Sequence, residues 1–387
     1  MDVTGQVELT FRDETVRSGN HVNLSAVRSE DRWLWLAGDE TATVERLTLD
    51  SSAVPTVGDD QRSFDLAELV DLPGPPEQEA DIEGIARSGA WLWVVGSHSL
   101  VRKRAKAHHG EAKVFRRLAR VRREENRFVL ARLAVEETPD GPVVVREAAD
   151  GRRSALIGAS GAQNVADLLA DDEHLAPFLA IPSKDNGLDV EGLAVHGDTV
   201  YIGLRGPVLR GWAVVLEVAP VDEQPGRLAL ADLDDGLRYR KHLLDLGGLG
   251  VRDLCPDGDD LLVLAGPSMS LSGPVRIYRW RGAATSETAR VVRGDDLTLV
   301  TEVSHGAGED HAEGVALLAR GVDGAAPELL VVFDSPGPHR RPTSHSVLAD
   351  RIRLSEQGRP AHGDVAQPFV AGADAPAGGS VAGVPVP

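Results

Sequence analysis

Short apolar runs, separated by Gly, Asp and Pro, recur along this chain. Three of them open with the tetrapeptide Glu-Gly-aliphatic-Ala, at Glu83, Glu191 and Glu313. In the first two copies a second apolar run that ends in Gly follows, at 91–96 and 200–203. Runs of this length between turn residues are typical of β-strands. The pattern therefore predicts repeated pairs of strands.

Two further segments keep the pattern without the glutamate, 24–27 before 33–38 and 252–255 before 261–266. Leu24 and Arg252 take the glutamate's place in this alignment. The five segments begin at intervals of 59, 108, 61 and 61 residues, and each interval has room for four short strands. Recurring four-stranded units with few helices are typical of a β-propeller. We predict an all-β propeller of four-stranded blades, with five blades favoured and six as the alternative.

The long interval between Glu83 and Glu191 has two explanations, a degenerate sixth blade or insertions into a five-bladed ring. We favour insertions, because 128–135 and 143–147 have the pattern of outer strands for the second blade. A basic loop insertion then occupies about 98–127. A short helical insertion occupies about 150–185, where apolar residues recur near helical spacing from 163 to 179. Both insertions are expected on the face where the central channel opens.

The pattern predicts a single domain over residues 1–360. The ring is expected to close by pairing of the first strand, 7–11, with 351–354, which removes two open sheet edges. Residues 361–387 are rich in Ala, Gly, Pro and Val, and we expect them to be disordered.

Charge and cysteine content limit the partners and the compartment. The 387 residues include 60 acidic and 41 basic ones, a formal charge of −19, which repels phosphate backbones and anionic lipid. We therefore expect neither nucleic acid nor a membrane as partner, while a protein partner or a small anionic ligand stays open. Cys255 is alone and no secretory signal opens the chain, so a cytoplasmic protein is expected.

A propeller would bring polar residues from distant repeats to one channel mouth, because inner strands begin on the face where their neighbours end. The residues expected there are Asp39, Asp81, Glu83, His98, Asp189, Glu191, Arg205, Arg252, Asp253, Ser268, His311, Glu313 and Asp334.

Three glutamates in one channel repel each other unless a cation, an arginine or shared protons offset their charge. Glu83, Glu191 and Glu313 are therefore metal-ligand candidates for Ca²⁺ or Mg²⁺, which prefer carboxylate oxygens. Pairing of the carboxylates with Arg205 and Arg252 is a second solution. A third is a purely structural role, in which the Glu-Gly pairs cap neighbouring backbone. The sequence leaves all three open.

The remaining candidates serve an anionic ligand. Arg205, Arg252, Lys103, Arg104 and Asp189 are the ligand-binding candidates, and His98 is the candidate for moving a proton. The basic run that contains Lys103 and Arg104 is equally explained as a solvated charge run. The paired tryptophans at 33/35 and 91/93 are expected to pack in the core. No common hydrolase or nucleotide-binding signature is present in the sequence.

The run 184–194, the Gly-Leu-Arg-Gly-Pro-Val element at 203–208, the segment 96–99 and the segment 311–316 together resemble the bacterial family catalogued as domain of unknown function 3616. The likeness spans about residues 20 to 355. It implies a propeller and no established reaction. More distantly, the Glu-Gly-Leu-Ala strand starts look like those of phytase-like esterase and calcium-dependent lactonase propellers, in which channel carboxylates hold a metal.

Two hypotheses follow for function. In the first, the channel mouth binds a small anionic ligand or a divalent cation, and the protein is a metal-assisted hydrolase of an ester, phosphoester or lactone. In the second, the protein is a non-enzymatic scaffold for protein contacts whose channel glutamates are structural.

Overall fold

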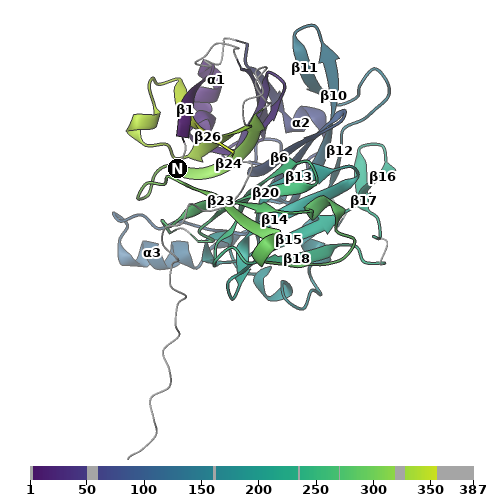
Figure 1. Ribbon diagram of the computed structural model, residues 1–387. Helices are drawn as coiled ribbons and strands as arrows, with labels where there is room; N and C mark the ends of the chain where they lie inside the picture. The colour runs from purple at the N-terminus through teal and green to yellow at the C-terminus, as the bar shows by residue number, and fades with distance from the viewer. Residues whose placement is uncertain are drawn as a thin grey trace, which may run out of the picture.

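The computed structural model describes residues 3–49, 60–159, 163–233, 236–269, 271–318 and 327–354. In these ranges five sheets of four or more strands are arranged around the centre of the molecule, with short helices at their periphery (Figure 1). We name each sheet by its innermost strand. The predicted all-β propeller arrangement is confirmed. The predicted tail at 361–387 lies outside the described residues.

Three of the sheets have the predicted four strands in antiparallel order. The β2 sheet consists of β2 (Leu24–Glu30), β3 (Trp33–Gly38), β4 (Thr43–Thr48) and β5 (Arg62–Asp65). The β19 sheet consists of β19 (Gly250–Asp257), β20 (Asp260–Gly266), β21 (Val275–Trp280) and β23 (Leu297–Val303). The β24 sheet consists of β24 (His311–Leu318), β25 (Glu328–Asp334), β26 (Ser346–Arg353) and β1 (Val3–Thr10).

The predicted closure of the ring is confirmed, because β1 at the start of the chain pairs antiparallel with β26 at its end. The predicted register is wrong, since residues 7–10 lie opposite 346–349 and not 351–354. Leu9 and Val347, which are partners in this ladder, are both buried in the core. The β24 sheet is thus built from both ends of the described chain, and β1 forms its outer edge.

The other two sheets carry additional strands. The β13 sheet consists of β13 (Asp189–His196), β14 (Thr199–Leu209), β15 (Trp212–Val218), β18 (Arg240–Leu244) and β22 (Val291–Val292). The β6 sheet consists of β6 (Ile82–Ser88), β7 (Trp91–Gly96), β10 (Leu130–Thr138), β11 (Gly141–Val145), β12 (Ala155–Ile157), β17 (Arg227–Leu230) and β16 (Pro220–Gln224). The hairpin β16–β17 leaves the β13 sheet to pair with the β6 sheet, and β22 likewise leaves the β19 sheet, so these excursions cover neighbouring sheet edges.

The long interval between Glu83 and Glu191 contains insertions and no further large sheet in the part of the chain that the structure describes. The basic segment was predicted as a loop, yet it forms the strands β8 (Val101–Arg102) and β9 (Val121–Arg122) with the helix α3 (Glu111–Leu118) between them. The single helix expected between 163 and 179 is wrong. Two short helices, α4 (Val165–Leu168) and η3 (Ala176–Phe178), stand there instead. The Asp172 carboxylate accepts the N–H groups of His174 and Leu175, which offers this backbone an alternative to helix.

The remaining helices are short and lie in connections: α1 (Asp13–Ser18), η1 (Asn20–Val22), α2 (Leu66–Leu69), η2 (Glu125–Phe128), η4 (Ser183–Asp185), η5 (Ala283–Thr285), η6 (Gly294–Asp296) and η7 (Pro338–Arg340).

The inner strands contact one another in a closed circle, β2 to β6, β6 to β13, β13 to β19, β19 to β24 and β24 to β2. The glycine of the Glu-Gly motif allows this close approach. A Cβ at Gly84 would lie 2.7 Å from the Leu193 Cβ of β13, and one at Gly192 would lie 2.9 Å from the Leu254 Cγ of β19. Real side chains do not tolerate such distances, so the motif glycine is required by packing between neighbouring inner strands.

Candidate functional site

Each inner strand carries a β-bulge near its start. The ladder register shifts between Ile82 and Gly84 in β6, and the other four inner strands shift at the corresponding point. The residues at these shifts are Ser25, Glu83, Glu191, Arg252 and Glu313. A bulge leaves one residue outside the ladder and redirects its side chain. We call these five residues the bulge ring.

The register corrects one sequence-based assignment. Ser25, rather than Leu24, occupies the glutamate's position in β2, while Arg252 occupies it in β19 as expected. Leu24 is fully buried and packs in a core cluster. The alignment of strand starts missed this because neither a glutamate nor a glycine marks the position in β2, so only the pairing with β3 identifies it.

Arg252 balances the two glutamates that flank it in the bulge ring. Its Nε lies 2.9 Å from Glu191 Oε2, and its Nη2 forms an ion pair with Glu313 Oε1. Arg205 adds a second cation, with Nη1 2.6 Å from Glu191 Oε1 and 3.6 Å from Asp189 Oδ2. All these side chains are at least nine-tenths buried. The sequence-predicted pairing of Arg205 and Arg252 with channel carboxylates is thus present, and we call Asp189, Glu191, Arg205, Arg252 and Glu313 the arginine side of the hub.

Burial and charge act in opposite directions on these groups. Burial lowers the pKa of Arg252, although Glu191 opposes the change. Burial also acts against the charged form of Arg205, but its carboxylate partners raise its pKa overall. Burial raises the pKa of Asp189 to about 8 despite the opposing effect of Arg205. The arginine side is therefore a compact, nearly neutral ionic network.

The opposite side of the hub holds carboxylates with less compensation. Oxygens of Asp39, Asp81 and Glu83 all lie within 4.8 Å of one another, and we call these residues the acid triad. Glu83 is only 8% exposed, and no hydrogen bond or ion pair joins it to any residue that the structure describes. The Oδ1 atom of Asp39 is also buried without a hydrogen-bond partner. Burial, and then the neighbouring carboxylates, raise the pKa of Glu83 well above its usual range and that of Asp39 to about 8.

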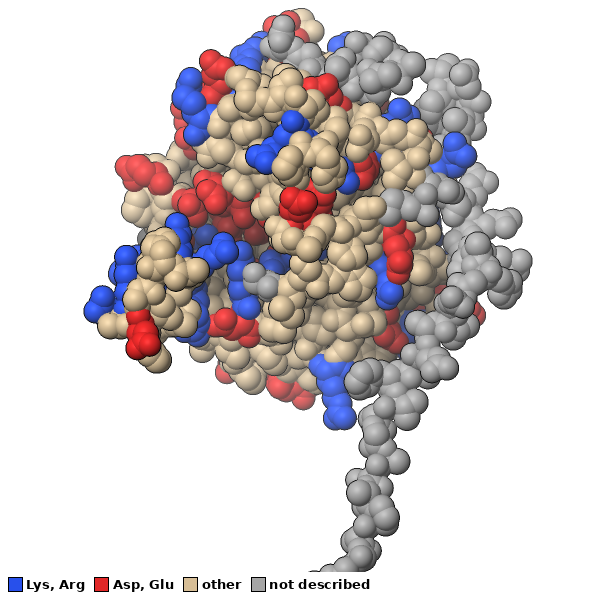
Figure 2. Space-filling view, turned by 90° about the vertical axis from the view of Figure 1, so that its left-hand side faces the viewer, with Lys and Arg blue, Asp and Glu red and all other residues tan. Residues whose placement is uncertain are grey.

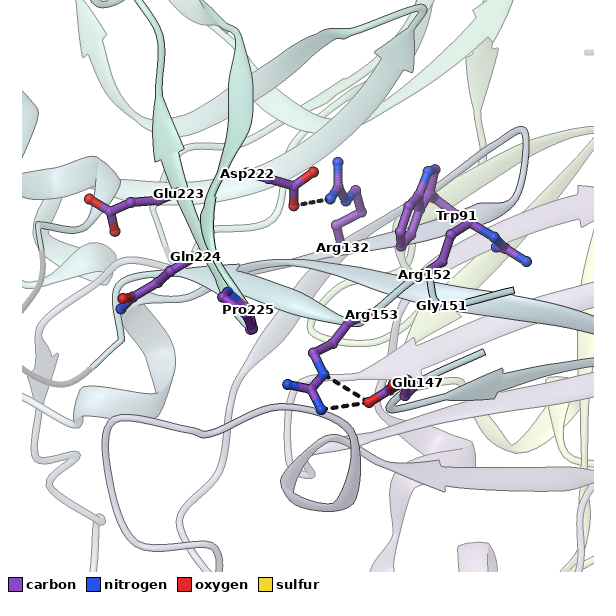
Figure 3. A pocket seen from close by; sticks show the side chains of 11 residues that line it. Trp91, Arg132, Glu147, Gly151, Arg152, Arg153, Asp222, Glu223, Gln224 and Pro225 are labelled. Carbon is purple, nitrogen blue, oxygen red and sulfur yellow. Dashed lines mark hydrogen bonds and ion pairs between the residues drawn. The ribbon is translucent and has the colours of Figure 1, made fainter. Parts of the chain in front are cut away.

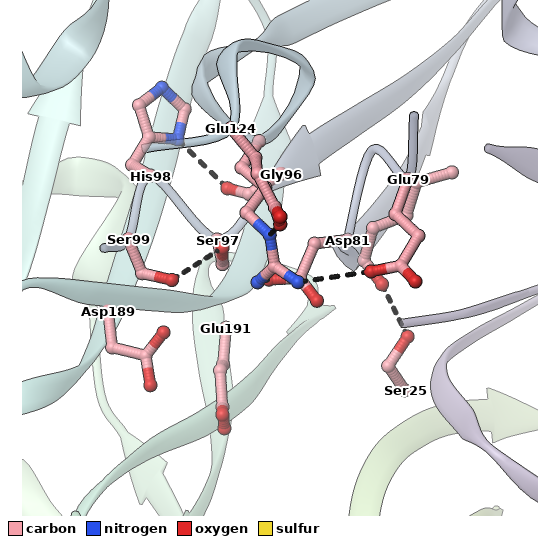
Figure 4. A network of polar contacts seen from close by, with 12 residues as sticks. Ser25, Glu79, Asp81, Gly96, Ser97, His98, Ser99, Glu124, Asp189 and Glu191 are labelled. Atoms are coloured by element: carbon pink, nitrogen blue, oxygen red, sulfur yellow. Dashed lines mark hydrogen bonds and ion pairs between the residues drawn. The ribbon is translucent and has the colours of Figure 1, made fainter. Parts of the chain in front are cut away.

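Asp81 is the one member of the acid triad with a cationic partner. It pairs with Nη1 of Arg127, whose Nε also lies 3.0 Å from Glu124 and whose Nη2 lies 3.2 Å from Glu79. Figure 4 shows Glu79, Asp81 and Glu124 gathered at this point, with Asp189 and Glu191 on another side of the channel. The Arg127 guanidinium thus pairs with three carboxylates but with neither Glu83 nor Asp39. The sequence list of channel residues contained neither Arg127 nor Glu79.

A second group of acidic residues borders the arginine side. Oxygen and nitrogen atoms of His311, Glu313 and Asp334 also lie within 4.8 Å of one another. Glu313 is already paired with Arg252, and His311 Nδ1 lies 3.7 Å from Asp334 Oδ2. Glu313 and Asp334 therefore have partners, whereas Glu83 and Asp39 make no ion pair with a described residue.

Arg28 closes the centre of the ring below the bulges. Its two terminal nitrogens lie 2.8 and 2.7 Å from the carboxylate oxygens of Asp253, and they also donate to the carbonyls of Leu193 and Val315, each at 2.8 Å. Arg28 is 4% exposed and Asp253 is fully buried. This pair joins β2, β13, β19 and β24. Sequence reasoning missed Arg28, although an arginine in an otherwise apolar inner strand was a signal.

His98 lies away from the hub carboxylates. Its Nδ1 is 2.8 Å from the carbonyl oxygen of Gly96, and its ring packs edge-on against Phe128 at a centroid distance of 5.8 Å. Figure 4 shows the ring turned away from Asp189 and Glu191. Burial lowers the pKa of His98 to about 4, which keeps the ring neutral at pH 7. Its proposed part in proton transfer stays a prediction.

Lys103 and Arg104 lie on the basic excursion, which we define as residues 101–123, at the edge of the same face. Lys103 follows β8, and its N–H donates to the Arg120 carbonyl at 3.1 Å. The Arg104 carbonyl accepts from Arg117 Nε at 2.6 Å. In Figure 2 Lys and Arg gather around this protrusion and line a hollow beside it, with an acidic patch above. No hydrogen bond or ion pair joins the side chain of Lys103 or Arg104 to a hub carboxylate among the residues that the structure describes.

A cavity of about 550 Å³ lies elsewhere, between the β6 sheet and the hairpin β16–β17 (Figure 3). Its three lining arginines are paired, Arg132 with Asp222, Arg152 with Asp150 and Arg153 with Glu147. Trp91 lines this cavity beneath the Arg132 guanidinium, whereas Trp35 and Trp93 pack in the core as predicted. Because its charges are balanced internally, the cavity is a weaker ligand candidate than the hub.

Comparison with known sequences identifies the family. The profile described as "Protein of unknown function (DUF3616)" matches residues 23–350. The chain belongs to this family. The resemblance expected from the Gly-Leu-Arg-Gly-Pro-Val element is thereby confirmed, and the bulge ring lies wholly inside the matched DUF3616 region. No curated protein matches the chain.

Solved structures match this DUF3616 chain at low similarity. One is a chain from the Saccharomyces cerevisiae complex of Dbp5 with Nup159 and Gle1, with 7% identity, a TM-score of 0.30 and coverage of 85% of this chain and 65% of that one. Another is glutaminyl cyclase from Myxococcus xanthus, with 11% identity, a TM-score of 0.36 and coverage of 90% and 98%. A third, an oxidoreductase (glucose dehydrogenase) from Thermus thermophilus, has 12% identity, a TM-score of 0.36 and coverage of 90% and 100%. Scores this low carry no argument about activity.

Proposed function

We propose that this protein is a five-bladed propeller that binds a divalent cation, Ca²⁺ or Mg²⁺, at the acid triad and uses it to bind a small anionic ligand at the channel mouth. Five large sheets and a closed circle of five inner strands support the blade number. The observation that carries the cation is Glu83, a nine-tenths buried carboxylate without a partner among the described residues, beside a buried Asp39 oxygen that also lacks one there. Removing charged oxygens from water without compensation is costly, and a bound cation would compensate both.

The geometry of the acid triad suits a hard cation. Two ligand oxygens at about 2.4 Å from one Ca²⁺ are at most about 4.8 Å apart. The oxygens of Asp39, Asp81 and Glu83 meet that limit. We place the cation here rather than between Glu83, Glu191 and Glu313, because the latter two glutamates already hold arginine partners.

The anionic ligand would contact the cationic side chains around the acid triad. Arg127 is already paired with Asp81, so Arg205 and Arg252 would be the hub cations that bind the anion. Lys103 and Arg104 add positive charge at the rim, which favours an approaching anion. A bound cation would supply Lewis acidity to a phosphoester, ester or lactone oxygen. We propose such a metal-assisted hydrolase as the specific activity, in the cytoplasm, where the buried single thiol of Cys255 stays reduced.

A structural role is the second candidate for part of the hub. The observation that favours it is the ion pairing of Glu191 and Glu313 with Arg205 and Arg252. In that case the arginine side only stabilises the ring, and the acid triad alone carries function.

Calorimetric and thermal titrations test the cation site. The EDTA-treated protein is titrated with CaCl₂, MgCl₂ and MnCl₂, and its Tm is followed. A cation at about 100 times its Kd should add about 2.7 kcal/mol to the free energy of unfolding. Glu83→Gln should abolish this gain, whereas Glu302→Gln, at an exposed carboxylate on β23, should retain it.

Two outcomes would contradict the proposal. Absence of binding by any of the three cations below millimolar concentration would remove the site. An equal gain in wild type and in Glu83→Gln would move the cation away from the acid triad. Hydrolysis is assayed separately with p-nitrophenyl phosphate, p-nitrophenyl acetate and γ-butyrolactone, and turnover that survives EDTA would reject a metal-assisted reaction.

A further inference from the structure

The basic excursion concentrates positive charge on an acidic protein. Residues 101–123 hold ten of the 41 basic residues of the chain and one of its 60 acidic residues. The structure gives ion pairs to only three of the ten, Arg102, Arg122 and Arg123. The other seven make no ion pair with any described residue. The excursion is therefore an uncompensated cationic protrusion, and compensation by the acidic body does not explain it.

The helix of the excursion also exposes an apolar surface. Phe115 is 76% exposed and Leu118 is 43% exposed, and Val121 just beyond the helix is 39% exposed. Positions 114, 115 and 118 fall on one side of a helix with 100° per residue, and Lys113, Arg116 and Arg117 fall on the other. No residue of α3 is buried. The protein thus presents an amphipathic helix whose apolar side chains Phe115 and Leu118 are exposed.

The excursion is nevertheless held firmly in place. β8 and β9 pair with each other, with Val101 opposite Arg122, and Arg102 Nε lies 2.6 Å from Asp185 Oδ2. Figure 1 shows α3 standing out from the body at one side of the molecule. A fixed, convex shape suits a flat surface better than it suits a peptide, which needs a groove.

We propose that α3 docks this protein on an anionic phospholipid bilayer. The apolar side chains Phe115 and Leu118 would enter the boundary of the acyl chains, while Lys113, Arg116 and Arg117 would contact lipid phosphates. No helix in the described part of the chain is long and apolar enough to cross a membrane, so the contact is peripheral.

The net charge of −19 argued against anionic lipid for the molecule as a whole. That argument treats the charge as evenly spread, whereas repulsion from the acidic body is screened beyond about 8 Å at physiological salt. A protrusion with uncompensated cations at its tip contacts the surface first. The docked protein would turn the mouth-side face that carries α3 toward the membrane, so the surface would also orient the hub.

Vesicle sedimentation with the full chain tests this proposal. Vesicles of phosphatidylcholine alone are compared with mixed vesicles of phosphatidylcholine and phosphatidylglycerol. Wild type should partition at least about tenfold better into the mixed vesicles. Phe115→Ser with Leu118→Ser should lose most of this binding, and so should Lys113→Gln with Arg116→Gln and Arg117→Gln. Val221→Ser, at a 44% exposed apolar side chain on β16, which lies on the side of the molecule opposite α3 (Figure 1), is the matched control and should bind as wild type.

A fluorescent probe tests insertion directly. Cys255 is 3% exposed, so a cysteine introduced at the exposed position Ala119 can be labelled selectively with an environment-sensitive dye. Its emission should shift to the blue only with the mixed vesicles. The proposal is overturned if wild type does not sediment with them, if the Phe115/Leu118 variant binds like wild type, or if the dye reports no apolar contact. Retention on immobilised polyglutamate or RNA without vesicle binding would assign the surface to another partner.

Discussion

Two positions of the bulge ring lack the glutamate, and they have opposite effects. Arg252 in β19 stands between Glu191 and Glu313 and pairs with both. Ser25 in β2 stands between Glu313 and Glu83, and its hydroxyl donates to the carbonyls of Ile82 and Ala37 instead. Arg252 balances the charge of the two glutamates beside it, whereas Ser25 gives Glu83 no partner. The comparison teaches that a candidate site arises where one repeat departs from the others and no arginine balances the charge of the neighbouring glutamate.

The largest expected effect comes from removing the compensation on the arginine side. Arg252→Met leaves Glu191 short of one partner and Glu313 without its cation, both deeply buried. Loss of one partner of a buried pair costs about 3–5 kcal/mol, because the other charge stays desolvated. Chemical denaturation of wild type and variant measures it. The double variant Arg252→Met with Glu313→Gln should recover part of the loss, and no recovery would contradict this account.

A pH titration should show the unbalanced state of the acid triad. The pKa of Asp39 is raised to about 8 in the fold, against about 4 when unfolded, so folding takes up a proton between these values. The free energy of unfolding should therefore fall as the pH rises from about 4 to about 8. In EDTA we expect Asp39→Asn to remove about 2 kcal/mol of this fall. The expected amount is smaller than the full pKa shift implies, because water still reaches this partly exposed carboxyl.

Asp189 on the arginine side contributes a slope of the same sign, so the Asp39→Asn variant should be flatter than wild type without becoming level. Denaturation curves of wild type and variant are measured between pH 4.5 and 8.5, at intervals of about one pH unit. They give the free energy of unfolding at each pH, and hence its slope. A slope unchanged by Asp39→Asn would show that this carboxyl ionises normally in the fold.

Ser25→Ala should have a smaller effect, because it removes one neutral hydroxyl from the bulge ring. The loss of its hydrogen bonds to backbone carbonyls is expected to cost about 1 kcal/mol. Thermal denaturation measures this, and cation binding at the acid triad should persist. A loss as large as that of Arg252→Met would mean that the two exceptions in the ring are energetically equivalent.

The smallest effect is expected for an ion pair outside the hub. Arg153→Ala breaks the pair with Glu147, whose side chains are 45% and 54% exposed. Exposed pairs contribute about 0–1 kcal/mol, so the change should stay below about 0.5 kcal/mol. The same denaturation assay serves as the baseline for the hub variants. A large loss here would show that burial is not what separates the hub pairs from surface pairs.

The repeat itself was readable from the sequence, and so was much of the hub. Glu83, Glu191 and Glu313 follow one motif because the glycine after each must pack against the next inner strand. That constraint recurs in several repeats and leaves a visible spacing. The pairing of Arg205 and Arg252 with carboxylates was also among the expected solutions, since both residues occur at strand positions that meet at the channel.

For other parts of the site, the sequence did not show which residues would meet. Arg28 reaches across the ring to Asp253, 225 positions away. The helix α3 lies in a run whose charge suggested a loop. The bulge in β2 falls at Ser25 and not at Leu24, which depends on the pairing of β2 with β3.

The sequence by itself determined that the chain forms repeated short strands, that its ends can meet, and that acidic residues open the inner strands. Only the tertiary structure decided which carboxylates receive a cationic partner and which do not. The physical reason is that strand formation depends on neighbours along the chain, whereas the charge balance of the hub depends on side chains that five different strands bring together after ring closure.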